Sequence, residues 1–206
     1  MSGKVSAEVA GSPVRRRKNL RSEQSIRKVL DATVEELTEV PYSDLTVRAV
    51  AARAGVSPTT AYTYFPSKEA LVAEVYLRLL LDAPTFTDVN DTAATRVKAQ
   101  LRSLLLLMAD RPYLADACTI AIIADDAAVE AVRMKIAGEI SRRINASLGP
   151  GHPGVIAPTL HMIFSGALLH ARSTPGGYGA MTGALDDAVA LVLAADDVNA
   201  PVTGTP

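Results

Sequence analysis

The chain has 206 residues, of which 49% are hydrophobic and 4% aromatic, with a single cysteine, Cys118. One cysteine excludes an intramolecular disulfide, and the N-terminal stretch has no apolar run of the signal-peptide kind, so we expect a cytoplasmic protein. The formal net charge of −1 divides unevenly, because residues 1–80 carry 12 Lys and Arg against 9 Asp and Glu, and the remainder carries 9 against 13. A positive end on an otherwise acidic protein favours a polyanionic partner at that end.

Apolar residues recur at helical spacing along most of the chain, and no segment is convincing as a strand. Proline and glycine divide this pattern into about nine helices, with three short ones within residues 22–65 and longer, more apolar ones after Ser67. The sequence therefore predicts an all-α protein with an N-terminal domain at residues 21–66 and a larger helical domain at residues 67–196. We expect residues 1–20 and 197–206, which are rich in Gly, Ser, Pro or charge, to be disordered.

The N-terminal segment contains a basic run. The run consists of Arg15, Arg16, Arg17 and Lys18. Two interpretations fit these residues, an arm that enters the minor groove of DNA and a solvated tail. The sequence leaves both open.

Residues 46–65 contain two short helical segments separated by a tight turn. Thr46 is placed to cap the first segment, and Gly55 supplies the permissive backbone that the turn needs. Ser57 is placed to cap the second segment, with Pro58 at its first helical position. Two short helices that cross at a turn of small residues predict a helix-turn-helix, whose second helix enters the major groove of DNA.

The N-terminal end of this second helix is expected to face the bases. Its candidate base contacts are Pro58, Thr59, Thr60 and Thr63. Threonine makes no bidentate contact, so direct readout of single bases should be modest. Arg48 and Lys68 lie at the starts of helices, where the helix dipole favours acids, and this placement indicates a bound phosphate. Tyr62 and Tyr64 fit the same surface, whereas Phe65 is expected to fill the core.

Residues 46–65, followed by Pro-Ser-Lys-Glu-Ala-Leu at 66–71, resemble the TetR family of bacterial transcriptional regulators. The similarity rests on a Thr-Val-Arg helix, an Ala-Gly-Val-Ser turn, a Tyr-x-Tyr-Phe end and a Ser-Lys-Glu helix start, and it extends over residues 22–80. It implies phosphate contacts from Arg48, Tyr62, Tyr64 and Lys68, and base contacts from Thr59, Thr60 and Thr63. Thr-Thr-Ala stands at 59–61 where many members have Gly-Thr-Leu, so a base preference cannot be transferred.

The last two long helices, expected at about 155–172 and 181–195, are apolar nearly all round. A helix of this kind must be covered on every side. Terminal helices of one chain lie on its surface, so a second copy of the protein is the natural cover, and the resemblance implies the same homodimer.

The most apolar window, residues 155–169, contains Pro158, His161 and Ser165 and is too short to span a bilayer, so we expect no membrane helix.

Apolar residues on the predicted helices five to eight either line a ligand cavity or fill a core. These candidates are Leu101, Leu104, Leu105, Met108, Tyr113, Ile122, Met134, His161 and Phe164. His161 either orients a ligand or bonds a nearby carbonyl. The resemblance implies a repressor that a largely apolar small-molecule inducer releases from palindromic, double-stranded operator DNA. Control by a protein partner and activation of transcription remain alternatives.

The residues offer little support for an enzyme, a metal site or a cofactor. Residues 177–183 are glycine-rich but follow no strand, so they predict a linker between two helices and not a phosphate-binding loop. No serine or cysteine has a legible base partner, and Cys118 is expected to be unreactive. His161 and His170 are out of phase on a helix, and His152 lies in a Pro/Gly loop, so we predict no metal site.

Overall fold

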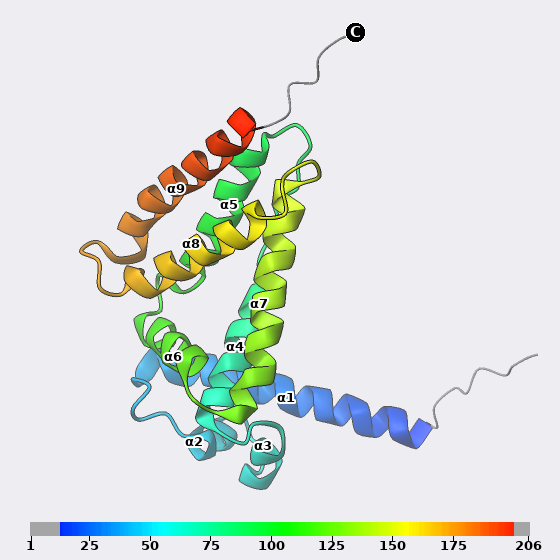
Figure 1. The fold of residues 1–206 in the computed structure, drawn as a ribbon. Helices are drawn as coiled ribbons and strands as arrows, with labels where there is room; N and C mark the ends of the chain where they lie inside the picture. The colour runs from blue at the N-terminus through cyan, green and yellow to red at the C-terminus, as the bar shows by residue number, and fades with distance from the viewer. Residues whose placement is uncertain (1–12, 200–206) are drawn as a thin grey trace, which may run out of the picture.

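The computed structural model describes residues 13–199, and within that range it contains helices and no strand (Figure 1). The elements are α1 (Pro13–Glu39), α2 (Val47–Arg53), α3 (Pro58–Tyr64), α4 (Lys68–Asp82), α5 (Ala93–Leu105), the 3-10 helix η1 (Leu106–Met108), α6 (Pro112–Ile123), α7 (Ala127–Leu148), α8 (Ile156–Ala171) and α9 (Gly177–Asn199). The predicted all-α class is confirmed.

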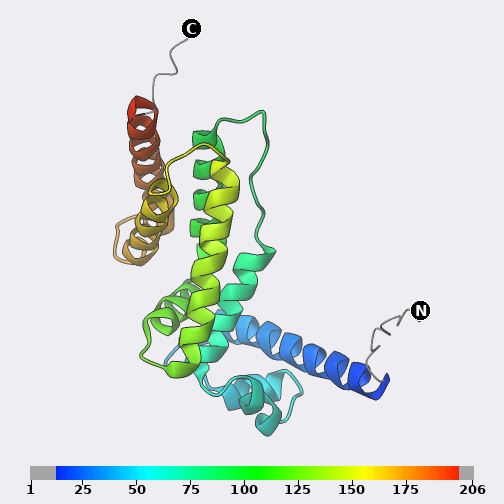
Figure 2. The same ribbon diagram turned by 45° about the vertical axis from the view of Figure 1, so that its right-hand side comes forward.

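The molecule is elongated, with α2 and α3 at one end and α5, α8 and α9 towards the other (Figures 1 and 2). Helices α4 and α7 pack along each other and join the two ends. The centre of the core lies on α4, where Leu71, Val72, Val75 and Tyr76 are fully buried. A helix buried on nearly all its faces transmits a displacement at one end to the other, because close-packed neighbours leave little room for bending.

The first helix differs from the expectation. Helix α1 begins at Pro13 and has 27 residues, so the prediction of a short first helix preceded by disorder is wrong for residues 13–20. Proline is favourable at the first helical position, and no Gly or Pro follows until Pro41, so nothing in the basic run interrupts the helix. Residues 1–12 and the side chains of Arg15 to Lys18 lie outside the described part of the chain, so the alternatives of arm and tail stay open.

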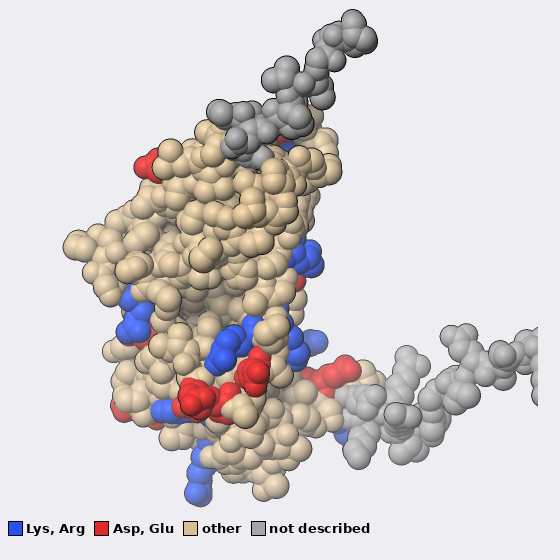
Figure 3. Space-filling view, viewed as in Figure 1, with Lys and Arg blue, Asp and Glu red and all other residues tan. Residues whose placement is uncertain are grey.

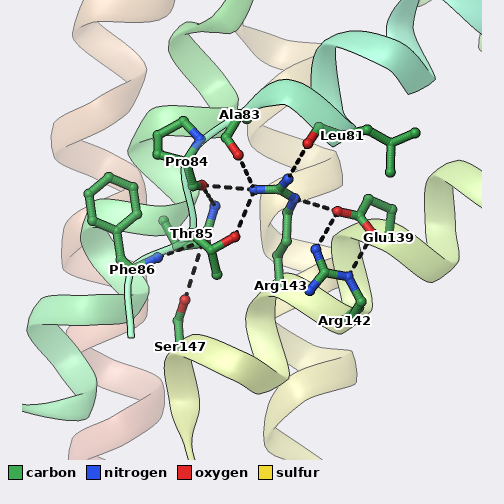
Figure 4. A network of polar contacts seen from close by, with 10 residues as sticks. Leu81, Ala83, Pro84, Thr85, Phe86, Glu139, Arg142, Arg143 and Ser147 are labelled. Atoms are coloured by element: carbon green, nitrogen blue, oxygen red, sulfur yellow. Dashed lines mark hydrogen bonds and ion pairs between the residues drawn. The ribbon is translucent and has the colours of Figure 1, made fainter. Parts of the chain in front are cut away.

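A buried arginine ties α7 to the end of α4 (Figure 4). The Arg143 side chain is 2% exposed, and its Nε donates to Glu139 Oε1 at 2.7 Å. Its terminal nitrogens donate to the carbonyl oxygens of Leu81, Ala83 and Pro84 at 3.2, 2.9 and 2.8 Å. Because these carbonyls at the end of α4 have no intrahelical donor, the guanidinium caps the helix while the carboxylate balances its charge.

The two C-terminal helices pack on each other and leave an apolar outer surface. Helix α9 runs from Gly177 to Asn199. The prediction that residues 177–183 form a linker is therefore wrong, because they are the first turns of the helix. The prediction of a disordered tail is wrong for residues 197–199, which end the helix. Met162 on α8 and Leu191 on α9 are 71% and 73% exposed. In Figure 3 the part of the surface over α8 and α9 is mostly uncharged, while Lys, Arg, Asp and Glu gather over the lower half.

Within the described residues, the segment 177–195 of α9 is long and apolar enough to cross a membrane by length and composition, contrary to the expectation that the chain has no such helix. Only 17% of that stretch is buried in the subunit. Length and composition are weak evidence for a span, because a helix that packs against another protein has the same character.

Candidate functional site

Helices α2 and α3 form the predicted helix-turn-helix, and the predicted caps are present. Thr46 Oγ1 accepts a hydrogen bond from Ala49 N at 3.1 Å, and Ser57 Oγ accepts one from Thr60 N at 3.2 Å. Gly55 has a φ of +63°, the left-handed conformation that favours glycine in the turn. These local interactions fix where α3 begins and therefore which side chains its N-terminal end presents.

Arg53 anchors the helix-turn-helix to α1. Its guanidinium contacts Glu36 Oε2 at 2.6 Å and both carboxylate oxygens of Glu39, at 2.8 and 2.6 Å. The hydrogen bonds from Arg53 lower the pKa of Glu39, because they stabilise its ionised form. This bidentate pair holds α2, and with it α3, in a defined orientation on α1.

The predicted base-facing residues lie on α3, with Pro58, Thr59 and Thr60 in its first turn and Thr63 near its C-terminal end. Pro58, Thr59 and Thr63 are exposed, whereas Thr60 is half-buried. The Thr60 hydroxyl lies 2.8 Å from Ser57 Oγ, and the Thr63 hydroxyl donates to the Thr59 carbonyl oxygen at 2.8 Å. Thr60 is thus partly engaged in the cap, and Thr59 and Thr63 present their side chains most openly.

The structure places the predicted phosphate-binding cations at the same end of the molecule. Arg48 is exposed at the start of α2. Lys68 Nζ donates to the Tyr42 carbonyl oxygen at 3.1 Å and lies 4.3 Å from the centroid of the Tyr42 ring. An ammonium has three donor hydrogens, so the hydrogen bond to the Tyr42 carbonyl oxygen positions Lys68 and leaves two donor hydrogens for a phosphate. The Tyr42 hydroxyl in turn donates to Glu69 at 2.7 Å.

The two tyrosines of α3 differ in their surroundings. Tyr62 is 48% exposed. Tyr64 is half-buried, and its hydroxyl donates to Ser22 Oγ on α1 at 2.7 Å. A phenol has one proton and phosphate oxygens only accept, so Tyr64 can donate to phosphate only if its bond to Ser22 breaks or reverses, with the Ser22 hydroxyl as the donor. In this geometry Tyr64 fixes α3 to α1, a contact between residues 42 positions apart that the sequence did not indicate.

Two further cations beside α3 were missed in the sequence. Arg21, Gln24 and Lys28 on α1 line a groove of about 350 Å³ whose other wall includes Ser57 and Thr60. The available signal was their spacing, because positions i, i+3 and i+7 lie on one face of a helix. They extend the basic surface from the helix-turn-helix onto α1.

A cavity of about 210 Å³ lies between α4, α6, α7 and α8. It is lined by Tyr76, Thr119, Ile122, Ile123, Arg133, Ile136, Ala137, Ile140, His161, Phe164, Ser165, Leu168 and Leu169. Of the nine predicted ligand residues, Ile122, His161 and Phe164 meet there.

The other six predicted ligand residues do not line this cavity. Leu101, Leu104, Leu105 and Met108 are at most 1% exposed and belong to the core. Tyr113 and Met134 are 41% and 70% exposed, because Tyr113 stands in the first turn of α6 and Met134 lies on the side of α7 opposite its buried Val132 and Ile136. Helical spacing alone did not separate core, surface and cavity.

The polar groups of the cavity are mostly engaged with the protein. His161 Nδ1 lies 3.0 Å from Ser141 Oγ, and burial lowers the pKa of His161 below its ordinary value of 6.5. Arg133 donates to the carbonyl oxygens of Ile122 and Ala124, at 2.8 and 2.7 Å, and so caps the end of α6. Among the described side chains, no group of three or more His, Cys, Asp or Glu is placed to hold a metal ion.

The chain is similar to known regulators in sequence and in fold. The profile described as "Bacterial regulatory proteins, tetR family" matches residues 29–75. HTH-type transcriptional regulators of Mycobacterium tuberculosis and Mycobacterium bovis, described as uncharacterized, are 47% identical over 190 residues, covering 91% of this chain and 88% of theirs.

Solved structures show the same fold. A TetR transcriptional regulator from Rhodococcus sp. RHA1 has a TM-score of 0.71 at 22% identity, covering 86% of this chain and 98% of that chain. A TetR variant from Acinetobacter baumannii, solved in complex with minocycline, has a TM-score of 0.56 at 20% identity, covering 82% and 96%.

Proposed function

Since this chain belongs to the TetR family of bacterial regulatory proteins and is a transcriptional regulator, we propose that it is a repressor released from a palindromic operator by a largely apolar small molecule. In this proposal residues 21–66 bind the DNA in the cytoplasm, and residues 67–196 bind the ligand and dimerise. The observation that carries the proposal is the position of α4, which begins at the DNA-facing end and contributes Tyr76 to the cavity.

The DNA-binding part of the proposal is supported by the charges around α3. Thr59 and Thr63 are exposed on α3, and cations from three other helices lie at the same end of the molecule. These cations are Arg21 and Lys28 on α1, Arg48 on α2 and Lys68 on α4. Cations that flank a short exposed helix neutralise the phosphates on both sides of the groove that the helix enters.

The dimer is supported by the outer surface of α8 and α9. Large apolar side chains such as Met162, Leu169 and Leu191 are exposed there, and single subunits rarely leave such a surface uncovered. Small residues of α9, including Gly183, Ala184 and Ala190, are also exposed and allow a second helix to approach closely. A second copy with the same face would bury both sets, as expected for a two-fold interface.

Ligand release is supported by the path from the cavity to the DNA. Two half-sites on one face of DNA are about 34 Å apart per helical turn, so a small change in the spacing of the two α3 helices loses contacts at both half-sites. A ligand that displaces α4 at Tyr76 would move Lys68 and the attached helix-turn-helix. The A. baumannii TetR variant, a protein of the same fold, was solved in complex with the small molecule minocycline.

The proposal is tested by selecting duplexes from a random-sequence library with the purified protein. We expect a palindrome with two half-sites, and we expect a cavity ligand to lower the affinity for it. A selected duplex without a repeat would contradict the dimeric repressor. DNA binding that no cavity ligand changes would favour control by a protein partner, and increased transcription from a promoter carrying the site would identify an activator.

A further inference from the structure

The cavity contains an unusual polar group, the hydroxyl of Tyr76. The Tyr76 side chain is 0% exposed and lines the cavity. Its hydroxyl oxygen has no hydrogen-bond partner among the described residues. A buried hydroxyl without a partner is costly and is rare in folded proteins, so its presence calls for a physical explanation.

Three other polar groups of the cavity have partners, and the hydroxyl of the fourth, Ser165, belongs to a residue that is only half-buried. Thr119 donates to the Ala115 carbonyl oxygen at 2.8 Å, and Arg133 caps α6 through two carbonyl oxygens. His161 is paired with Ser141. Most of the remaining lining is aliphatic or aromatic, including Ile136, Ile140 and Phe164. Tyr76 is therefore the lining residue whose buried hydroxyl is left to pair with a ligand.

We propose, on the basis of the ligand-released repressor described above, that the cavity accepts a small, neutral, largely apolar molecule with one carbonyl or hydroxyl oxygen, which bonds the Tyr76 hydroxyl. The volume of about 210 Å³ lies below the range of about 300 to 1,000 Å³ usual for drug-sized ligands, which favours a small molecule. The hydrogen bond forms on α4 itself, so the ligand contacts the helix that begins at Lys68.

An anion is disfavoured beside Tyr76, and Arg133, the charged residue of the lining, already donates to two carbonyl oxygens at the end of α6. Burial raises the pKa of Tyr76, with smaller contributions from nearby Cys118 and Tyr178, because the site stabilises an anion poorly. A carboxylate placed beside Tyr76 would meet the same penalty. A neutral oxygen gains the hydrogen bond without it.

The experiment compares three probes with one ring and one ethyl group: 4-ethylphenol, ethylbenzene and 4-ethylbenzoate. Binding to the full-length protein is measured by isothermal titration calorimetry at pH 7.5. We expect 4-ethylphenol to bind at least about tenfold more tightly than ethylbenzene, as one buried hydrogen bond of about 1.4 kcal/mol provides, and we expect 4-ethylbenzoate to bind most weakly. Tyr76→Phe should abolish the preference for 4-ethylphenol and leave ethylbenzene binding unchanged.

Tyr178→Phe is the matched control. The Tyr178 hydroxyl is also buried without a partner among the described residues, yet Tyr178 does not line the cavity. Its removal should leave the preference for 4-ethylphenol intact. Both variants should fold, because neither substitution breaks a hydrogen bond of the free protein, and melting temperatures no lower than that of the wild type would confirm this.

The outcomes separate the ligand chemistry from the proposed function. Equal binding of 4-ethylphenol and ethylbenzene, or a preference that survives Tyr76→Phe, overturns the assignment of Tyr76 while the cavity remains a ligand site. Tightest binding of 4-ethylbenzoate overturns the requirement for a neutral ligand. If none of the three probes binds, both the assignment and the ligand-binding part of the proposed function fail.

Discussion

The Ser67 hydroxyl donates a hydrogen bond of 2.5 Å to Asp126 Oδ2, and this contact joins the starts of α4 and α7, two helices that pack along each other. Each residue also caps its own helix, because Ser67 Oγ accepts from Ala70 N at 3.0 Å and Asp126 Oδ1 accepts from Ala128 N at 2.8 Å. The bond from Ser67 is the largest cause of the lowered pKa of Asp126. The two caps form one unit where the helix-turn-helix meets the larger domain.

Coupling between these caps predicts non-additive stabilities. Ser67→Ala should cost about 1 kcal/mol through the lost cap of α4, plus the lost bond to Asp126. In an Asp126→Ala background the same substitution should cost less, because that bond is already absent. Chemical unfolding of both single variants and the double variant checks this. Strictly additive costs would show that the two caps act independently.

Lys68→Ala should weaken binding to every DNA duplex by a similar factor, because Lys68 is assigned to a phosphate and not to a base. The slope of log affinity against log salt concentration should fall in magnitude by about 1. Fluorescence anisotropy over a salt series measures both quantities. Lys98→Ala, the same charge change on α5 at the far end of the molecule, should leave them unchanged. An altered sequence preference with unaltered affinity would contradict the assignment.

Tyr62→Phe should mainly weaken DNA binding, whereas Tyr64→Phe should mainly lower the stability of the protein. Tyr62 is exposed, so loss of its hydroxyl should weaken DNA binding and leave stability nearly unchanged. Tyr64→Phe removes the bond to Ser22 and should destabilise the protein by about 1 kcal/mol. Unfolding curves and DNA titrations of the two variants distinguish the roles. A larger loss of DNA affinity in Tyr64→Phe than in Tyr62→Phe would show that the Tyr64 hydroxyl donates to the operator and no longer to Ser22.

Leu191→Glu should dissociate the dimer and leave the subunit folded, because Leu191 is 73% exposed in the single subunit and lies on the proposed interface. Sedimentation velocity at micromolar concentration and circular dichroism measure the two properties. Val89→Glu is the control, since Val89 is 90% exposed in the segment between α4 and α5. A Leu191→Glu protein that remains dimeric would place the interface elsewhere.

His161 should make the stability depend on pH. Its pKa is lowered from 6.5 by burial, so as the pH falls the unfolded chain binds a proton before the folded protein does. The stability that is fully present above pH 6.5 is therefore lost progressively as the pH falls through the folded pKa. Melting temperatures between pH 7.5 and 5 should fall less for His161→Gln than for the wild type. Parallel curves for the two proteins would show that His161 does not contribute.

The sequence by itself determined the local features of this protein. The caps at Thr46 and Ser57, the turn at Gly55 and the number of helices each depend on interactions between residues a few positions apart, and such interactions are legible in the order of residue types. The limits of α1 and α9 were misjudged for the complementary reason. A basic run is typical of a solvated tail and a glycine-rich run is typical of a linker, but neither contains a proline that forces an end inside the helix.

Only the tertiary structure decided which distant residues meet. Tyr64 reaches Ser22 and Ser67 reaches Asp126 across 42 and 59 positions, and these contacts depend on how helices cross, not on their composition. The lining of the cavity was predicted only in part for the same reason. Leu104 in the core and Ile122 at the cavity have the same apolar character and helical spacing. Whether an apolar side chain fills a core or borders a hollow depends on the side chains opposite it, which packing alone brings into place.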